Sequence, residues 1–300
     1  MTILGLFIVG CIGGFLFGMV GIGGNVLYIP IFSYLLMQIG FHDEELSRAV
    51  IANALLVLIF TGTAVSWQQF KVGNFFLKEI LWTASMGVTT AFCISWWIQS
   101  SDWYDKKTFD MVFTALLFLT LTRLFTSKKQ ENTTESNGNT MKSKENMTES
   151  KENLTKEDPS VSKPFLTSKL PFLLIGSFTG ALTAFSGLGG SIVMIPLFTE
   201  FVGLPMKKAH SISTGVVPLL ALTISTFYCF GAPHLPKIPF SQVGYLNFGI
   251  VAPVIVGSML TSPFGVRAAH NVKPVTQRLV FATIVGVVLC KMLFNFFNFQ

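Results

Sequence analysis

Two stretches of the chain decide its architecture: GCIGGFLFGMVGIGGNVLYIPIF (residues 10–32) and GSFTGALTAFSGLGGSIVMIPLF (residues 176–198). Laid on one another at an offset of 166, they are identical at nine of 23 positions. The identities include Gly10/Gly176, Gly14/Gly180, Gly21/Gly187, Gly23/Gly189, Gly24/Gly190 and Pro30/Pro196. The similarity resumes, shifted by six residues, in RAVIANALL (48–56) and KAHSISTGV (208–216), where Asn53 stands opposite Ser213. The chain is therefore built from two related halves.

The composition places both halves in a membrane. Of the 300 residues, 51% are hydrophobic, 12% are charged and 30 are phenylalanine, and the mean hydropathy is +0.59. Residues 126–170 hold 15 of the 36 charged residues, which leaves 21 among the other 255. A chain of this kind cannot cover itself with a polar surface, which excludes a water-soluble enzyme.

Five apolar segments follow one another in each half, and a helix needs about 20 apolar residues to cross the hydrocarbon. The segments are 3–20, 24–39, 49–67, 76–98 and 107–125, then 170–186, 190–202, 210–230, 243–264 and 276–297. The residues between the halves are mostly Lys, Glu, Asn, Thr and Ser, a composition that cannot bury enough surface to fold. We therefore predict an N-terminal transmembrane repeat (1–125), a disordered charged linker (126–169) and a C-terminal transmembrane repeat (170–300). The expected fold class is an all-α polytopic helical bundle.

The distribution of charge predicts that the two repeats are inverted. If each half crosses the bilayer an odd number of times and the linker is cytoplasmic, the positive-inside rule is satisfied. One side then collects Lys71, Lys78, Arg123, Lys128, Lys129, Lys207, Lys208, Arg267, Lys273 and Arg278. Three N-x-T sequons in the linker, at Asn132, Asn146 and Asn153, are the contrary sign, because glycans are added only on the luminal side. We expect a multi-pass protein with a cytoplasmic linker, and the plasma membrane is the favoured location.

The duplicated GxGG sequence predicts a broken helix in each half. It ends one apolar run and opens another of only about 13 to 16 residues, which is short for a complete span. Glycine permits positive φ, so the chain can turn there and expose the first amides of the next helix, which attract anions. The candidate substrate-binding residues are Gly21, Gly23, Gly24 and Asn25 in one half and Gly187, Gly189, Gly190 and Ser191 in the other. The alternative is close helix packing, which is the favoured interpretation for Gly10, Gly14, Gly18, Gly176, Gly180 and Ala184.

Polar residues of the third segment in each half complete the candidate site. Asn53 and Ser213 match across the repeat, and Thr214 follows Ser213. We predict that they donate hydrogen bonds to the ligand, although Ser and Thr in membrane helices also bond to their own backbone. His210, at the start of its segment, is interpreted as an interfacial residue and not as a proton carrier.

The sequence lacks the usual signatures of catalysis and cofactor binding. The four cysteines (Cys11, Cys93, Cys229 and Cys290) show no metal-ligand spacing, and GxGG without a strand before it is not a dinucleotide fingerprint. The basic excess falls in short loops beside apolar runs, so nucleic acid is not an expected partner. We expect no catalytic residues, no metal and no cofactor.

The motifs FGMVGIGGNVLYIPIF and FSGLGGSIVMIPLF, each followed by a short loop and a polar helix, resemble the TauE/SafE sulfite exporter family. The resemblance covers the chain apart from the linker, and it departs from the usual pattern at Asn25 and Ser191, where a further glycine is common. It implies a secondary transporter of small sulfur-containing or organic anions, such as sulfite and sulfonates. An anion-selective channel and an integral membrane enzyme are the alternatives. The implied partners are then the bilayer and a small anion. The resemblance leaves open whether a proton or a sodium ion is coupled to transport and whether the protein forms a homo-oligomer.

Overall fold

The computed structural model describes residues 3–21, 24–41, 43–100, 108–118, 122, 169–231 and 242–272, and residues 276, 279, 282–283 and 285–290 near the C-terminus. Apart from Lys169, the expected linker lies outside these residues, and so does Gly23 of the candidate site.

The described residues of the first half are helical apart from short turns and loops. It contains α1 (Ile3–Val20), α2 (Asn25–Ile39), α3 (Asp43–Lys71), α4 (Leu77–Gln99) and a further helix, Thr108–Phe118. The short helix α2 begins at the GxGG sequence, as predicted, and ends at Gly40, whose φ of 108° only glycine adopts readily. Helix α3 is longer than predicted because the polar residues before position 49 continue it.

The second half repeats this order of helices with one interruption. Its helices are α6 (Leu170–Ser186), α7 (Ser191–Glu200), α8 (Met206–Cys229) and α9 (Phe248–Asn271). The prediction of a helix from residue 243 was wrong at its start, because β1 (Gln242–Val243) and β2 (Leu246–Asn247) form a small hairpin there. Gly244 makes the turn with a φ of 58°, and Asn247 caps α9 by accepting a hydrogen bond from the Ile250 amide at 3.3 Å.

Four of the described helices are long and apolar enough to cross a membrane. They are Ile3–Val20, Glu45–Lys71, Met206–Cys229 and Phe248–Ala269. Many of the large apolar side chains that stay exposed lie on the outer faces of helices, among them Trp67, Phe92 and Phe264. An apolar outer surface around a buried core suits a protein surrounded by lipid, and the mostly helical architecture agrees with the predicted fold class.

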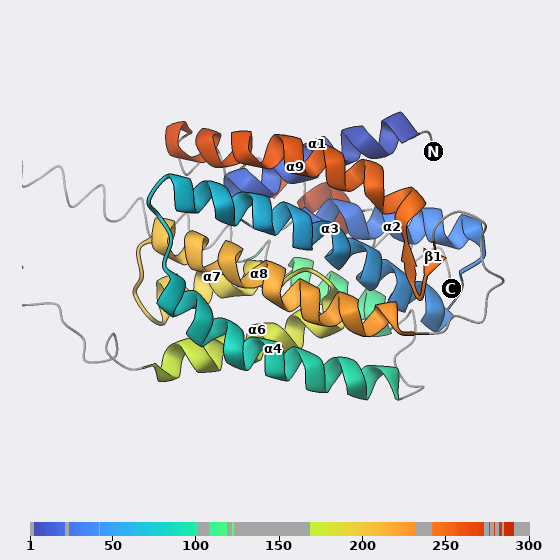
Figure 1. The fold of residues 1–300 in the computed structure, drawn as a ribbon, viewed down its shortest axis with the longest axis horizontal. Helices are drawn as coiled ribbons and strands as arrows, with labels where there is room; N and C mark the ends of the chain where they lie inside the picture. The colour runs from blue at the N-terminus through green and yellow to red at the C-terminus, as the bar shows by residue number, and fades with distance from the viewer. Residues whose placement is uncertain are drawn as a thin grey trace, which may run out of the picture.

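The helices of the two halves are interleaved (Figure 1). Helix α1 lies along α9 of the other half, and α6 lies correspondingly along α4. Helices α3 and α8 cross at the centre, where α2 packs on α3 and α7 packs on α8. The same set of packing pairs results if the two halves exchange places, so the duplication seen in the sequence extends to tertiary contacts.

Glycines make the α1–α9 and α6–α4 contacts close. A Cβ atom at Gly10 would collide with the backbone of Val254, and one at Gly14 with the backbone of Ser258. In the other pair, Gly176 lies against the backbone of Thr83 and Gly180 against that of Gly87. Positions 83 and 87 of α4 therefore correspond to 254 and 258 of α9, both at a separation of 171. The packing interpretation of these glycines is confirmed.

We expect Gly14→Ala to lower the thermal stability of the purified protein without changing its affinity for substrate, because the methyl group forces α1 away from α9. Gly286→Ala is the matched control, since it is also a helical glycine but no atom of the described residues lies within 4 Å of the added Cβ. There alanine should leave stability unchanged or raise it by about 0.5–1 kcal/mol through helix propensity. Equal melting temperatures for Gly14→Ala and wild type would contradict the close contact.

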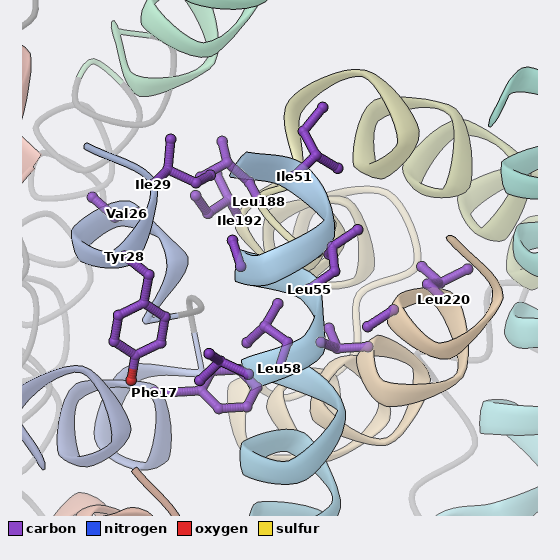
Figure 2. Packing of buried hydrophobic residues seen from close by; sticks show 14 of the residues in the cluster. Phe17, Val26, Tyr28, Ile29, Ile51, Leu55, Leu58, Leu188, Ile192 and Leu220 are labelled. Atoms are coloured by element: carbon purple, nitrogen blue, oxygen red, sulfur yellow. The ribbon is translucent and has the colours of Figure 1, made fainter. Parts of the chain in front are cut away.

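The core around the central crossing is apolar and comes from both halves. Figure 2 shows Phe17, Val26, Tyr28 and Ile29 of the first half facing Leu188 and Ile192 of the second, with Ile51, Leu55 and Leu58 of α3 between them and Leu220. All of these side chains are buried. The few polar groups in this region are therefore held in a nonpolar environment, where each requires a hydrogen-bonding partner.

Candidate functional site

The glycine turn of the first half ends α1 and starts α2. The amide of Gly21 donates to the Phe17 carbonyl at 2.8 Å, and Gly21 has a φ of 75°, as the sequence predicts. Gly24, the N-cap of α2, has φ −59° and ψ −10°, so the prediction of a positive φ does not hold there. Glycine is required at position 24 for space, because a Cβ would lie 2.8 Å from the Gly13 carbonyl oxygen and 2.9 Å from the Tyr28 ring.

The glycine turn of the second half has the predicted backbone throughout. Gly187 (φ 67°) ends α6, Gly189 has φ 80°, and Gly190 (φ 71°) is the N-cap of α7. The Ser186 hydroxyl accepts a hydrogen bond from the Leu188 amide at 3.3 Å and steadies the turn. Helices α2 and α7 thus both begin at a glycine that offers no side chain as a cap. The amides of Leu27 and Val193 donate to the carbonyls of these two glycines at 2.9 and 3.2 Å, so the amides of the first two residues of each helix are the ones left without an acceptor in the helix.

The two turns meet through Asn25. Its Nδ2 atom donates to the Gly187 carbonyl oxygen at 2.5 Å, which joins residues 162 positions apart. Because a carbonyl oxygen only accepts, this bond fixes the orientation of the Asn25 amide and leaves Oδ1 pointing elsewhere. The Asn25 side chain is fully buried. The first residues of α2 and the end of α6 are therefore held together in the interior.

Three predicted site residues carry buried polar atoms without a hydrogen-bond partner among the described residues. They are Oδ1 of Asn25, Oγ of Ser191 and Oγ of Ser213, and all three side chains are fully buried. Buried polar atoms are nearly always paired in native proteins, with protein, water or ligand. Ser191 is the first residue of α7, Asn25 is the first of α2, and Ser213 lies on α8, which packs on α7.

Each glycine turn rests against the third helix of the opposite half. A Cβ at Gly21 would strike the His210 ring of α8, and one at Gly187 would lie 3.3 Å from Ile51 of α3. At Gly189 the added atom would be 2.6 Å from Cδ1 of Leu58, also on α3. Both turns are thus seated in the α3–α8 crossing.

Asn53 and Thr214 have hydrogen-bonding partners inside the protein. The Asn53 Nδ2 atom donates to the carbonyls of Ala49 at 2.7 Å and Tyr245 at 2.9 Å, and Oδ1 accepts from the Asn247 amide at 2.8 Å. The Thr214 hydroxyl donates to the His210 carbonyl at 2.9 Å. To donate a hydrogen bond to an anion as predicted, either side chain would have to give up these hydrogen bonds. In this arrangement Asn53 anchors the hairpin before α9 to α3.

His210 is the side chain at the first glycine turn that sequence reasoning missed. Its Cδ2–Nε2 edge lies directly on Gly21, and its Nδ1 atom is 3.0 Å from Nε2 of Gln69 on α3. The repeat gave no signal for it, because the corresponding residue of the first half is Val50. Its position four residues into α8 suggested the interface instead.

The described residues contain no group of three or more His, Cys, Asp or Glu side chains that could hold a metal ion. The four cysteines are free. Lys208 Nζ in the first turn of α8 and Glu79 Oε1 in the first turn of α4 form an ion pair, 2.8 Å apart.

Comparison with known proteins agrees with this description. The family model described as "Sulfite exporter TauE/SafE" matches residues 6–292. A "Probable membrane transporter protein" of Haemophilus influenzae is 24% identical over 285 residues, which cover 95% of this chain and 96% of that protein. A protein of the same description from Methanocaldococcus jannaschii is 24% identical over 288 residues, 94% of this chain and 92% of its own length. No solved structure matches the chain significantly.

Proposed function

The chain belongs to the sulfite exporter TauE/SafE family and is a multi-pass membrane transporter, and from this premise we propose that it is a secondary carrier that holds a small anion between its two glycine turns. The observation that carries the proposal is the hydrogen bond from Asn25 to Gly187, which joins the start of α2 to the glycine turn that leads into α7, and neither helix has a side-chain cap. The family match places the chain among transporters and not among enzymes.

The chemistry of this region suits an oxyanion. Two helix starts supply partial positive charge and amide donors, and the buried hydroxyls of Ser191 and Ser213 can donate as well. The Asn25 Oδ1 atom can accept from a protonated oxygen, such as the O–H of hydrogen sulfite, or from a bound water. The turns themselves contain no Lys or Arg, so binding by dipoles should be of modest affinity and allow release. Sulfite and sulfonates are the substrate class that the family name suggests.

The proposal includes inverted repeats, and the α3–α8 crossing supports them. Along these two equivalent helices, Gln69 contacts His210, Ser66 donates to the Thr214 carbonyl at 2.9 Å, and Ser225 donates to the Ala52 carbonyl at 3.3 Å. Residue numbers rise on one helix as they fall on the other, so α3 and α8 run in opposite directions (Figure 1). Inverted repeats put a shared site near the middle of the membrane and permit alternating access by relative movement of the halves.

Charge supports a cytoplasmic location for the end at which α3 stops and α8 starts. Helices α3 and α9 end here and α4, α6 and α8 begin here (Figure 1), so by the helix bounds the described cations at this end are Lys71, Lys78, Lys169, Lys207, Lys208 and Arg267. The described acidic residues there are Glu79 and Glu200, whereas the opposite end has Arg48 with Asp43, Glu44 and Glu45. The positive-inside rule then puts the linker in the cytoplasm, because Lys169 leads into α6 at the same end. We also propose that the protein is located in the plasma membrane, with the linker on its cytoplasmic side.

Transport by the purified protein in liposomes tests the function. A carrier should show saturable uptake of radiolabelled sulfite that is accelerated when unlabelled sulfite or a sulfonate is present on the other side. A channel would give flux that rises linearly with concentration and follows the membrane voltage, without acceleration by substrate on the other side. Such flux would show that the protein is an anion-selective channel and not a carrier.

We expect Ser213→Ala to weaken binding of sulfite by about 1–3 kcal/mol, because a hydrogen bond to a charged ligand is lost. Since the Ser213 hydroxyl has no partner among the described residues, its removal should leave stability almost unchanged. Thr214→Val is the neighbouring control, whose hydroxyl already bonds to the His210 carbonyl. Equal sulfite affinity in Ser213→Ala and wild type, measured by equilibrium binding, would remove Ser213 from the site.

A further inference from the structure

A chain of amide hydrogen bonds determines which nitrogen of His210 carries the proton. The Asn74 Nδ2 atom donates to the carbonyl of Lys207 at 3.3 Å, so the orientation of the Asn74 amide is fixed. The same Nδ2 atom donates to Oε1 of Gln69 at 3.1 Å. Gln69 must therefore present Nε2, a donor, to Nδ1 of His210 at 3.0 Å. The Nδ1 atom accepts, which makes the imidazole neutral with its proton on Nε2.

The protonated nitrogen lies on the side of the ring that faces the first glycine turn. An added Cβ on Gly21 would lie closest to the Cδ2 and Nε2 atoms of His210, and these contacts are possible only because position 21 is glycine. Gln69 is 2% exposed and His210 is half-buried, so the contact between them is partly shielded from water.

We propose that the Nε2–H group of His210 is a hydrogen-bond donor to the transported oxyanion at the first glycine turn, with Gln69 and Asn74 as positioning residues that fix its tautomer. This inference rests on the proposed function. It adds a side chain of the second half to the site, next to Gly21 at the end of α1. A neutral donor suits a carrier, because it contributes a hydrogen bond without the strong attraction of a full charge that would slow release.

The charged groups around His210 are consistent with a neutral ring. Lys207 and Lys208 lie on its own helix, Lys71 lies at the end of α3, and Lys78 and Glu79 lie in the first turn of α4. On α7, which also packs on α8, the charged residue is Glu200. Glu79 is paired with Lys208. The surplus of cations opposes a further positive charge on the ring, and Gln69 offers it no acceptor at Nδ1.

Gln69→Glu tests the proposal by reversing the tautomer. A carboxylate at position 69 still accepts from Asn74, but it also requires a proton on His210 Nδ1, so a neutral ring turns a lone pair toward Gly21. Anion binding then needs the imidazolium. Methanesulfonate stays ionised at every pH used. In this variant its affinity should fall about tenfold per pH unit once the pH is high enough for the imidazolium to lose its proton. Wild type should show no such slope between pH 6 and pH 8.

Asn74→Asp should give the same slope by a second route. An aspartate at position 74 has no proton to donate, so Gln69 must turn its Nε2 donor toward the aspartate and its oxygen toward His210. Asn74 lies in the loop after α3, where the change is less of a threat to folding. His210→Gln keeps a donor near the position of Nε2 but does not titrate. It should bind within a few-fold of wild type, and the slope should vanish in the double variant Gln69→Glu/His210→Gln. His210→Ala should lose about ten- to hundredfold in affinity.

The measurements are equilibrium binding of methanesulfonate and sulfite to the purified full-length protein, with gel filtration and melting temperature as checks of folding. Saturable binding to wild type with a flat pH profile in both Gln69→Glu and Asn74→Asp would overturn the role of His210 and leave the proposed function intact. Wild-type affinity in His210→Ala would do the same. If wild type binds neither methanesulfonate nor sulfite, the proposed function fails and this inference fails with it.

Discussion

Replacing Gly189 with alanine should abolish sulfite transport. Gly189 has a φ of 80°, a conformation that costs other residues about 1–2 kcal/mol. The added Cβ would also lie 2.6 Å from Leu58 and 3.4 Å from Val217, which are both buried in the α3–α8 crossing. Either the Leu58 side chain or the turn must shift, and the strain of alanine at a positive φ favours movement of the turn. The first amides of α7 would then move out of the position in which we propose that they hold the anion.

Gly203→Ala is the control that separates displacement of the second glycine turn from the strain of placing alanine at a positive φ. Gly203 has a φ of 74°, but in the described part of the chain no atom lies within 4 Å of an added Cβ, and Gly203 lies in the loop between α7 and α8. Both variants carry the same conformational cost, so both should show a small loss of thermal stability. Only Gly189→Ala should lose transport in liposomes. Normal transport by a folded Gly189→Ala protein would exclude the second glycine turn from the site.

Asn25→Asp should reduce sulfite binding on the order of a thousandfold. The carboxylate has nearly the same shape as the amide, but it cannot donate to the Gly187 carbonyl unless it is protonated. An ionised carboxylate at position 25 would instead occupy the positive start of α2 that we assign to the substrate. Two like charges about 4 Å apart repel by about 4 kcal/mol at an effective dielectric constant of 20, which is the source of this magnitude.

Asn25→Asp should fold with reduced thermal stability, because the favourable position of an acidic residue in the first turn of α2 offsets only part of its repulsion from the Gly187 carbonyl oxygen. Asn247→Asp is the matched control: Asn247 caps α9 through Oδ1, which aspartate retains. That variant should bind and transport sulfite as wild type does. Binding is measured on purified protein at pH 8, where the new carboxyl group should be ionised. Unchanged affinity in Asn25→Asp would show that the anion binds elsewhere.

Much of the fold can be predicted from the sequence, because the glycine and proline positions of the repeat determine where helices break. The short helices α2 and α7 begin at the predicted residues, and the packing glycines of α1 and α6 lie at helix contacts. The hairpin before α9 was not predictable from hydropathy. Val243, Tyr245 and Leu246 are as apolar as the helix that follows, and the turn depends on the single residue Gly244.

The candidate site was predictable in its backbone and less so in its side chains. The glycine pattern identified the turns, but it could not distinguish a glycine required for φ from one required for space, as at Gly24. Asn53 matched Ser213 across the repeat, yet its bonds are to the hairpin, which has no counterpart among the described residues of the first half. His210 was overlooked because a contact between halves leaves no trace in the comparison of one half with the other.

The central claim is that one anion lies between the starts of α2 and α7. An anomalous difference map from crystals grown with bromomethanesulfonate, first shown to compete with sulfite for transport, tests it most directly. The account predicts a bromine peak next to the first turns of both helices, close to Asn25 and Ser191. A peak elsewhere in the helical body, with none between the two turns, would contradict it.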